Sequence, residues 1–519
     1  MFSKVKICLC FAFLFFLCNT GVSAQEERSK IDTAKLGLSL KNIVDLAITQ
    51  SSALKYAQNQ HVSYYWRYRN FTKQFLPNLI LNGTFPNFTQ STVPVTQPDG
   101  SIEFKQVSNL SISSNLSLNQ YIPLTGTQIY ASTSFSRVQD YNNNSILYSG
   151  SPFSIGFSQP IFAYNWMKWS KKTEPMIYDE SQKNFIQTIE NIAYTATSYF
   201  FNYLRIQTQY NLAKSSFENS SDNLRIAQIK KKLGQISEND FSRIELSVLN
   251  AKKSMSSAKM DLKNADFTLK SYIGLDQKEN IELQMPLFIT LFDIDPQKAL
   301  KEARENRSEQ VYYLRRLITA ESQLTQAKRG NGLSATLSGN YGLTNSAETF
   351  PGIYDQPLLQ RMLQLTFSIP ILDWGKAASS VKMAESNRDL VSFDVKQAFE
   401  DFDRGVIVQV EQFGLLKDQL KTAEEADKVA ANGYIIALKK FQNGEITITD
   451  MNISSSERVT AKLDYINSLA TYWLAYYRLR ILTLYDFELN KKINYDNPML
   501  SNEKKTVKTN EIEGSKHVK

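Results

Sequence analysis

Residues 413–450 read FGLLKDQLKTAEEADKVAANGYIIALKKFQNGEITITD, within the stretch that decides the fold, Trp374 to Leu484. Apolar residues recur here at alternating steps of three and four, and only Asp427 interrupts the series. The series consists of Phe413, Leu416, Leu420, Ala423, Asp427, Ala430, Tyr434, Ala437 and Phe441. An average step of about 3.5 residues is the period of a coiled coil.

The helical pattern starts near Ser380, breaks at Asn443-Gly444-Glu445 and resumes from Met451 to Tyr485. The arm before the break has about 60 residues, and at about 1.5 Å per residue it is about 90 Å long. Helices of compact domains rarely exceed about 25 residues. The stretch therefore predicts an antiparallel hairpin of very long helices.

The N-terminus has the features of a secretory signal peptide, which we expect to occupy residues 1–24. Two lysines precede twelve apolar residues, Ile7 to Cys18, and small residues at 22 and 24 suit signal peptidase. Twelve apolar residues are too few to span a bilayer, which disfavours an uncleaved anchor. A lipoprotein attached through Cys18 is disfavoured because Phe16 and Leu17 are bulky.

The composition excludes several classes of function. All three cysteines lie in the signal peptide, and the two histidines, His61 and His517, are far apart in the sequence. This disfavours disulfides, a zinc site and a histidine-based triad. We also find no paired catalytic carboxylates and no phosphate-binding glycine loop, so we expect no enzyme, no metal and no cofactor. The net charge of +8 falls to +6 without Lys4 and Lys6, and the scattered basic residues do not indicate nucleic-acid binding.

Apolar and polar residues alternate in six segments, four between 78 and 162 and two between 333 and 371. Their partners are mostly Ser, Asn, Thr and Gln, so the polar face is nearly uncharged. Lipid outside and water inside a β-barrel would explain such a pattern better than a soluble sandwich. We expect surface loops at 93–100 and 141–152, which are rich in Asn, Gly, Pro and Ser.

The sequence repeats itself. Leu81-Asn82-Gly83 matches Leu337-Ser338-Gly339 at an offset of 256, and Phe157–Ile161 matches Phe367–Ile371 at an offset of 210. The offset of 210 also relates Gly234, Ile236 and Asp240 to Gly444, Ile446 and Asp450. The difference of 46 falls between the strands of the first half, which predicts longer loops or an extra hairpin there. These matches indicate a tandem repeat, and each copy consists of a helix, strands and a long broken helix.

This pattern resembles the outer-membrane efflux protein (TolC) family over residues 39–487. The resemblance rests on the repeat, on Gln159-Pro160-Ile161-Phe162 and Ile369–Lys376, and on the breaks Leu233–Ser237 and Asn443–Thr447. The long first-half loops and a helix near Trp166–Glu174 resemble the branch found in Bacteroidetes-type bacteria.

The resemblance implies an α+β membrane protein in the bacterial outer membrane that extends into the periplasm. Three identical chains would each supply four strands to one transmembrane β-barrel, continuous with a long periplasmic α-helical (coiled-coil) barrel. A closed assembly also removes strand edges that lipid does not tolerate. The expected divisions are 25–38, N-terminal segment; 39–75, helix; 76–162, strands and loops; 163–275, helical hairpin; 276–294, connector; 295–330, helix; 331–372, strands; 373–487, second hairpin; and 488–519, mobile tail.

The two helix breaks would form the periplasmic mouth of the channel. The tip residues predicted to contact a periplasmic adaptor protein are Gly234, Gln235, Ile236, Gly444, Glu445 and Ile446; the alternative is a plain solvated turn. The candidate gate residues are Asp450 and, more weakly, Asp240 and Glu238. Three copies of Asp450 would narrow the mouth and attract cations, unless the side chain only favours a helix N-terminus.

We therefore expect a trimeric outer-membrane channel that passively conducts substrates outward and is driven by an inner-membrane transporter through the adaptor. A type I protein-secretion duct is the rival within transport. A periplasmic coiled-coil scaffold without a pore is the rival from another class, and a secreted enzyme is disfavoured by the missing site.

Overall fold

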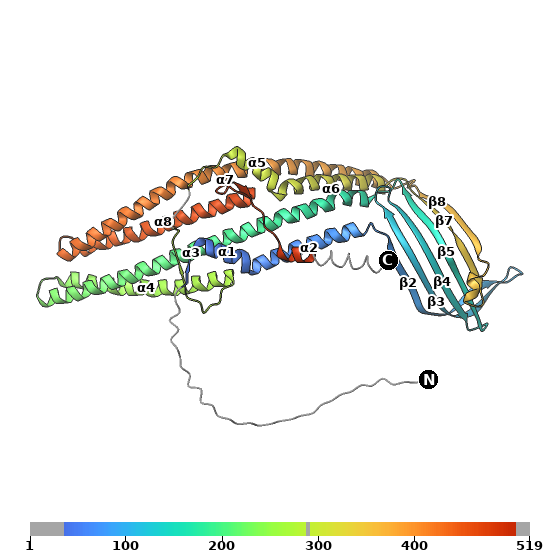
Figure 1. Cartoon of the computed structure of the whole chain (residues 1–519), viewed down its shortest axis with the longest axis horizontal. Coiled ribbons are helices and arrows are strands. Elements are labelled where there is room, and N and C mark those ends of the chain that lie inside the picture. The colour runs from blue at the N-terminus through green and yellow to red at the C-terminus, as the bar shows by residue number, and fades with distance from the viewer. Residues whose placement is uncertain (1–35, 287–290, 505–519) are drawn as a thin grey trace, which may run out of the picture.

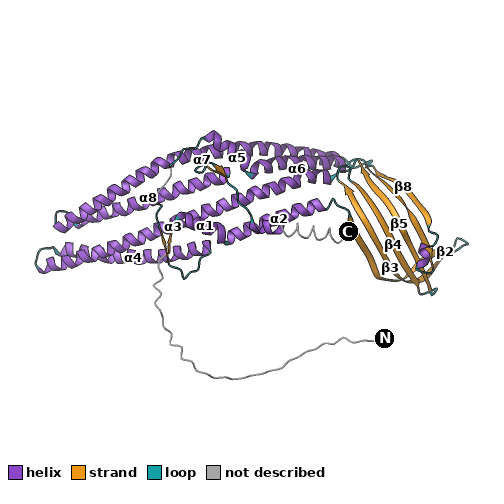
Figure 2. Cartoon of the chain, viewed as in Figure 1, coloured by secondary structure: helices purple, strands orange, loops and turns teal. Residues whose placement is uncertain are grey.

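The computed structural model describes residues 36–286 and 291–504, so the predicted signal peptide lies outside the described residues. The molecule is elongated, with a bundle of long helices at one end and a single large sheet at the other (Figure 1). Figure 2 shows that the long helices and the long strands occupy separate parts of the molecule. In the described part of the chain, no helix has a stretch long and apolar enough to cross a bilayer.

Two antiparallel hairpins make up the long helical part. The first consists of α3 (Trp166–Lys232) and α4 (Glu238–Ile273), and the second of α7 (Lys376–Asn443) and α8 (Ile448–Thr483). The 68 residues of α7 correspond to about 100 Å. The long-hairpin prediction is therefore confirmed.

The helix α3 starts at Trp166 and continues through Pro175. The helix expected near Trp166–Glu174 is therefore the first part of this long helix. The Asn165 side chain caps this start by accepting a hydrogen bond from the backbone N–H of Lys168 at 3.2 Å. A proline inside a helix removes one backbone hydrogen bond and crowds the carbonyl of the preceding turn, and α3 continues in spite of both effects.

Two shorter helical stretches are each broken into two helices. The first forms α1 (Leu40–Gln50) and α2 (Ser52–Lys73), and the second forms α5 (Pro296–Asn306) and α6 (Ser308–Gly330). The expectation of one continuous helix in each place was wrong, because Ser51 and Arg307 adopt extended backbone conformations.

Six antiparallel strands form one sheet in the order β2-β3-β4-β5-β7-β8. The strands are β2 (Asn78–Thr96), β3 (Ile102–Ile122), β4 (Thr127–Asp140), β5 (Ser145–Ile161), β7 (Ser334–Ala347) and β8 (Leu358–Ser368). The six alternating segments are thus all strands of one sheet, which has two strands more than the four per chain that the resemblance implied for the barrel. The 46-residue difference between the repeats is an extra hairpin, and the predicted loops are shorter than expected because strands extend into them.

The two faces of the sheet differ in polarity. Leu79, Leu118, Ala131, Ile155 and Tyr341 are successive cross-strand partners, so they share one face. Most of these large apolar side chains are exposed in the single chain; Leu79, for example, is 64% exposed. The opposite face carries pairs such as Ser117 with Ser132 and Ser158 with Ser338. The sheet is therefore apolar on one side and polar but uncharged on the other over most of its area.

The main hydrophobic core lies where α1, the middle of α3, the end of α4, the middle of α7 and the end of α8 pack together. Its largest fully buried side chains include Phe200, Phe413, Tyr472, Leu469 and Leu479. Two small sheets border this core. The strand β1 (Leu36–Leu38) pairs with β6 (Ile281–Leu283), and β9 (Tyr485–Asp486) pairs with β10 (Lys491–Lys492).

The prediction of a mobile tail from residue 488 is wrong for the described part of the C-terminal segment, which packs against the helices. Ile493, Asn497 and Leu500 are buried, and the Asn497 side chain donates a hydrogen bond to the carbonyl oxygen of Gln58 at 3.0 Å. The polar composition of this segment obscured its few apolar anchors. Residues 505–519 lie outside the described residues.

Candidate functional site

The two hairpin tips lie at the end of the molecule farthest from the sheet (Figure 1). At each tip a glycine ends the first helix with a left-handed backbone, with φ +69° at Gly234 and +83° at Gly444. A backbone hydrogen bond closes each turn, from Gln235 to Lys230 and from Glu445 to Lys440, at 2.8 and 2.9 Å. Only glycine adopts this conformation without steric cost, which explains why both breaks contain one.

The candidate acids sit at the N-termini of the return helices. Asp450 forms a capping box with Thr447, whose backbone N–H and hydroxyl donate hydrogen bonds to Oδ2 of Asp450 at 3.1 and 2.7 Å. The hydroxyl and the backbone N–H of Thr447 hold the pKa of the Asp450 carboxyl below its usual value. Asp240 accepts a hydrogen bond from the Ser237 hydroxyl at 2.7 Å. The cap interpretation thus has direct structural support for both residues.

Glu238 has a different partner. Its carboxylate lies 2.8 Å from Nζ of Lys231, across the turn, and its side chain is largely exposed. An exposed pair of this kind is worth little to stability.

The two tips are joined by a small apolar cluster that is separate from the main core. Its buried members are Ala227, Ile244, Tyr434, Ile448 and Met451. The half-buried residues packed against them include the predicted contact residues Ile236 and Ile446. The remaining predicted contact residues, Gly234, Gln235, Gly444 and Glu445, are exposed.

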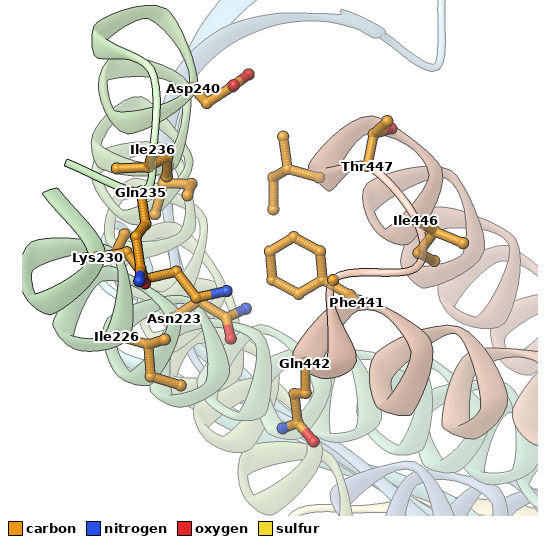
Figure 3. A pocket seen from close by; sticks show the side chains of 14 residues that line it. Asn223, Ile226, Lys230, Gln235, Ile236, Asp240, Phe441, Gln442, Ile446 and Thr447 are labelled. Atoms are coloured by element: carbon orange, nitrogen blue, oxygen red, sulfur yellow. The ribbon is translucent and has the colours of Figure 1, made fainter. Parts of the chain in front are cut away.

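A cavity of about 290 Å³ lies between the tips, lined by side chains from both hairpins (Figure 3). Ile236 and Asp240 line it from the first tip, and Phe441, Ile446 and Thr447 from the second. Asn223 also lines it; this side chain is 6% exposed and its amide nitrogen has no hydrogen-bond partner in the described structure. The structure thus brings both sets of tip residues to one end of the molecule.

A polar residue in the coiled-coil seam is compensated by a partner that the pattern alone did not reveal. Asp427 is mostly buried and pairs with Nζ of Lys462 on α8 at 2.8 Å. The apolar series is interrupted here because a cross-hairpin ion pair replaces the apolar contact.

The main core contains a buried ionic network that the sequence pattern does not reveal. The guanidinium of Arg480 on α8 donates two hydrogen bonds to the fully buried Glu190 on α3, at 2.7 and 2.9 Å, and one to Asp486 at 2.7 Å. The hydroxyl of Tyr495 donates to Glu190 at 2.7 Å. Burial alone would lower the pKa of Arg480, but hydrogen bonds and the charge of Glu190 raise it. The network fastens the two repeats and the C-terminal segment together.

No local signal marks this network, because Glu190 and Arg480 are 290 residues apart in the chain. Each lies in a helix where a charged residue is ordinary on an exposed face. Only the packing of the helices shows that both side chains point inward.

Comparison with known proteins identifies the second half of the chain. Residues 299–483 match the family model of the outer membrane efflux protein. This stretch is an outer membrane efflux protein domain. The resemblance to the efflux protein family is thereby confirmed, as is the outer-membrane location that it implied. The efflux proteins are channels, which agrees with the prediction that the chain is not an enzyme. Comparison with curated proteins finds no match.

Solved structures share the fold of nearly the whole chain. The CmeC outer membrane channel of Campylobacter jejuni has a TM-score of 0.62 at 15% identity, covering 89% of this chain and 88% of that one. VceC of Vibrio cholerae has a TM-score of 0.60 at 11% identity, covering 88% and 97%. The open-state MtrE channel of Neisseria gonorrhoeae has a TM-score of 0.57 at 14% identity, covering 88% and 90%. The first half therefore adopts the same fold as these channels, although the family model does not match it.

Proposed function

We propose that this efflux protein is the outer-membrane duct of a tripartite export system, passively conducting substrates that an inner-membrane transporter delivers through a periplasmic adaptor. The observation that carries this proposal is a sheet whose two edge strands, β2 and β8, have no further strand partner among the described residues. This sheet is attached to helical hairpins about 100 Å long. Unpaired strand edges are unstable in lipid, and pairing β8 of one chain with β2 of the next removes them. Three chains would then close a barrel over a helical tube.

A trimer in the outer membrane is directly testable. We expect outer-membrane fractions to contain a trimer that dissociates on heating, and the purified protein to conduct ions in planar bilayers. A soluble monomer without conductance would contradict the proposal. A periplasmic scaffold without a pore predicts that outcome, but it leaves the exposed apolar face of the sheet without a purpose.

The tips are the proposed adaptor contact. Ile236 and Ile446 already pack between the hairpins, so their replacement would disturb the tips themselves. The exposed residues Gln235 and Glu445 are better probes. We expect Glu445→Lys to weaken capture of the cognate adaptor, while Glu218→Lys on the exposed shaft of α3 does not. Equal capture by both variants would show that the tip is a plain turn.

The proposed gate at Asp450 can be separated from its role as a helix cap. Asp450→Asn removes the charge but retains a capping side chain, whereas Thr447→Ala removes the cap partner but retains the charge. A gate predicts that Asp450→Asn lowers the cation selectivity of single channels and Thr447→Ala does not. Unchanged selectivity in Asp450→Asn would leave the cap as the only role.

A type I protein-secretion duct would use the same geometry. No feature of the described residues favours one cargo pathway, because the duct performs no chemistry on what it conducts. The identity of the transporter and adaptor that bind this protein would distinguish the two kinds of system.

A further inference from the structure

The extra hairpin occupies a distinct place in the sheet. The strands β2, β5, β7 and β8 each lead into or out of a helix, but β3 and β4 are joined directly by the turn at 123–126. This turn lies at the helical end of the sheet. The strands β3 and β4 therefore extend from the helical end of the sheet to its outer end. They are not confined to a part of the sheet beyond the other strands.

Side-chain hydrogen bonds hold this turn against the start of α3 and against β5. The side-chain amide of Asn165, which also caps α3, donates hydrogen bonds to the carbonyl oxygens of Pro123 and Leu124 at 2.9 and 3.3 Å. The amide of Gln159 on β5 donates to the carbonyl oxygen of Thr125 at 3.2 Å. The base of the extra hairpin is thus fixed to the same residue that starts α3.

The extra strands carry the apolar face found on their neighbours. Leu116 and Leu118 of β3 and Ile129 of β4 are 38%, 44% and 39% exposed on the single chain. On the polar face their neighbours are Ser117 and Ser132, which are cross-strand partners. A strand facing water on both sides would not need this alternation.

The stagger of the strands gives the width of the sheet around a barrel. One row of cross-strand partners crosses the sheet from Leu79 on β2 to Arg361 on β8. Counted from the helical end of each strand, Leu79 is the second residue of β2 and Arg361 is the eighth residue of β8. A shift of six residues over five strand steps gives a tilt of about 40°, in the normal range for barrels. At a strand spacing of about 4.8 Å, six tilted strands cover about 38 Å of circumference and four cover about 25 Å.

The width of the helical part agrees with the circumference of six strands and not with that of four. Four helices, α2, α3, α6 and α7, meet the sheet in each chain. At about 8–10 Å per helix they cover about 32–40 Å of circumference. Six strands match this width, whereas four would narrow the duct where it enters the membrane.

We infer that the assembled duct has an eighteen-stranded membrane barrel, six strands from each of three chains, that continues the helical tube without narrowing. This inference rests on the proposed trimer. Barrel diameter grows about linearly with strand number, so the pore is about 1.5 times as wide as one built from twelve strands. Its lining of Ser, Asn, Thr and Gln carries few charges. The barrel therefore suits bulky cargo of either charge and leaves selection to other parts of the duct.

Lipid quenching of a fluorophore tests the inference, because the three native cysteines lie in residues 1–24 and single-cysteine variants are therefore clean. The probe is bimane on the protein that begins at Gln25, after removal of the predicted signal peptide, in vesicles of brominated phosphatidylcholine. The test variants are Leu116→Cys and Ile129→Cys on the extra strands. The controls are Leu81→Cys and Leu365→Cys on the edge strands, together with Ser117→Cys and Ser132→Cys on the polar face.

We expect the two test variants to be quenched as strongly as the edge-strand controls, and at least threefold more than the polar-face controls. Quenching of the edge-strand controls without quenching of the test variants would overturn the eighteen-stranded barrel but not the proposed function. No quenching at any of the four apolar positions would overturn both, since the sheet would then lie outside the bilayer.

Discussion

The buried network around Arg480 gives the sharpest prediction for stability. In Arg480→Met, Glu190 keeps only the hydroxyl of Tyr495 among its described hydrogen-bond donors, and its side chain is fully buried. Removing one partner of a buried ion pair costs about 3–5 kcal/mol, because a charge is left without compensation. Asp486, which is also buried, loses its contact with the same guanidinium. We therefore expect a loss of about 4 kcal/mol.

The assay is urea unfolding of the purified protein, followed by the helical circular dichroism signal. Arg388→Met is a matched control, because Arg388 and its partner Asp389 are both exposed and such a pair contributes under about 1 kcal/mol. The double variant Glu190→Gln/Arg480→Met should recover part of the loss, since no charge remains buried at Glu190. If Arg480→Met lowered the free energy of unfolding no more than Arg388→Met did, our reasoning about this network would be refuted.

Three further predictions concern the tips, the seam and the C-terminal segment. Gly444→Ala should destabilise the second tip by about 1 kcal/mol through its positive φ, seen as faster hydrogen exchange there, because no atom crowds the position. Lys462→Met should destabilise the hairpin by about 1–3 kcal/mol in urea unfolding, and the added change Asp427→Leu should restore stability; a double variant no better than the single one would contradict this. Burial and the charge of Lys504 lower the pKa of His61 in the folded protein. The unfolded chain therefore binds a proton at His61 more readily than the folded chain does. The free energy of unfolding should consequently fall as the pH drops below about 6.5. His61→Gln should remove that pH dependence in thermal unfolding scans, and an unchanged profile would show that other groups cause it.

The order of elements could be read from the sequence because the relevant signals are local. Apolar steps of three and four define the long helices, alternation defines the six strands, and glycine marks both tips. Each signal depends on a few neighbouring residues and on backbone geometry that they alone dictate. The tip candidates were located in this way, although the structure shows that Ile236 and Ile446 serve the packing between the hairpins.

The sequence alone determined a duplicated chain of long helical hairpins and half-apolar strands. Only the tertiary structure shows that the 46 additional residues of the first half form a hairpin, β3 and β4, that extends along the whole sheet. It also decided the partners of Glu190 and Asp427, since a charged residue in a helix looks the same whether it faces water or a partner distant in the sequence. Ion pairing and strand neighbours depend on which distant segments meet, and no local period encodes that meeting.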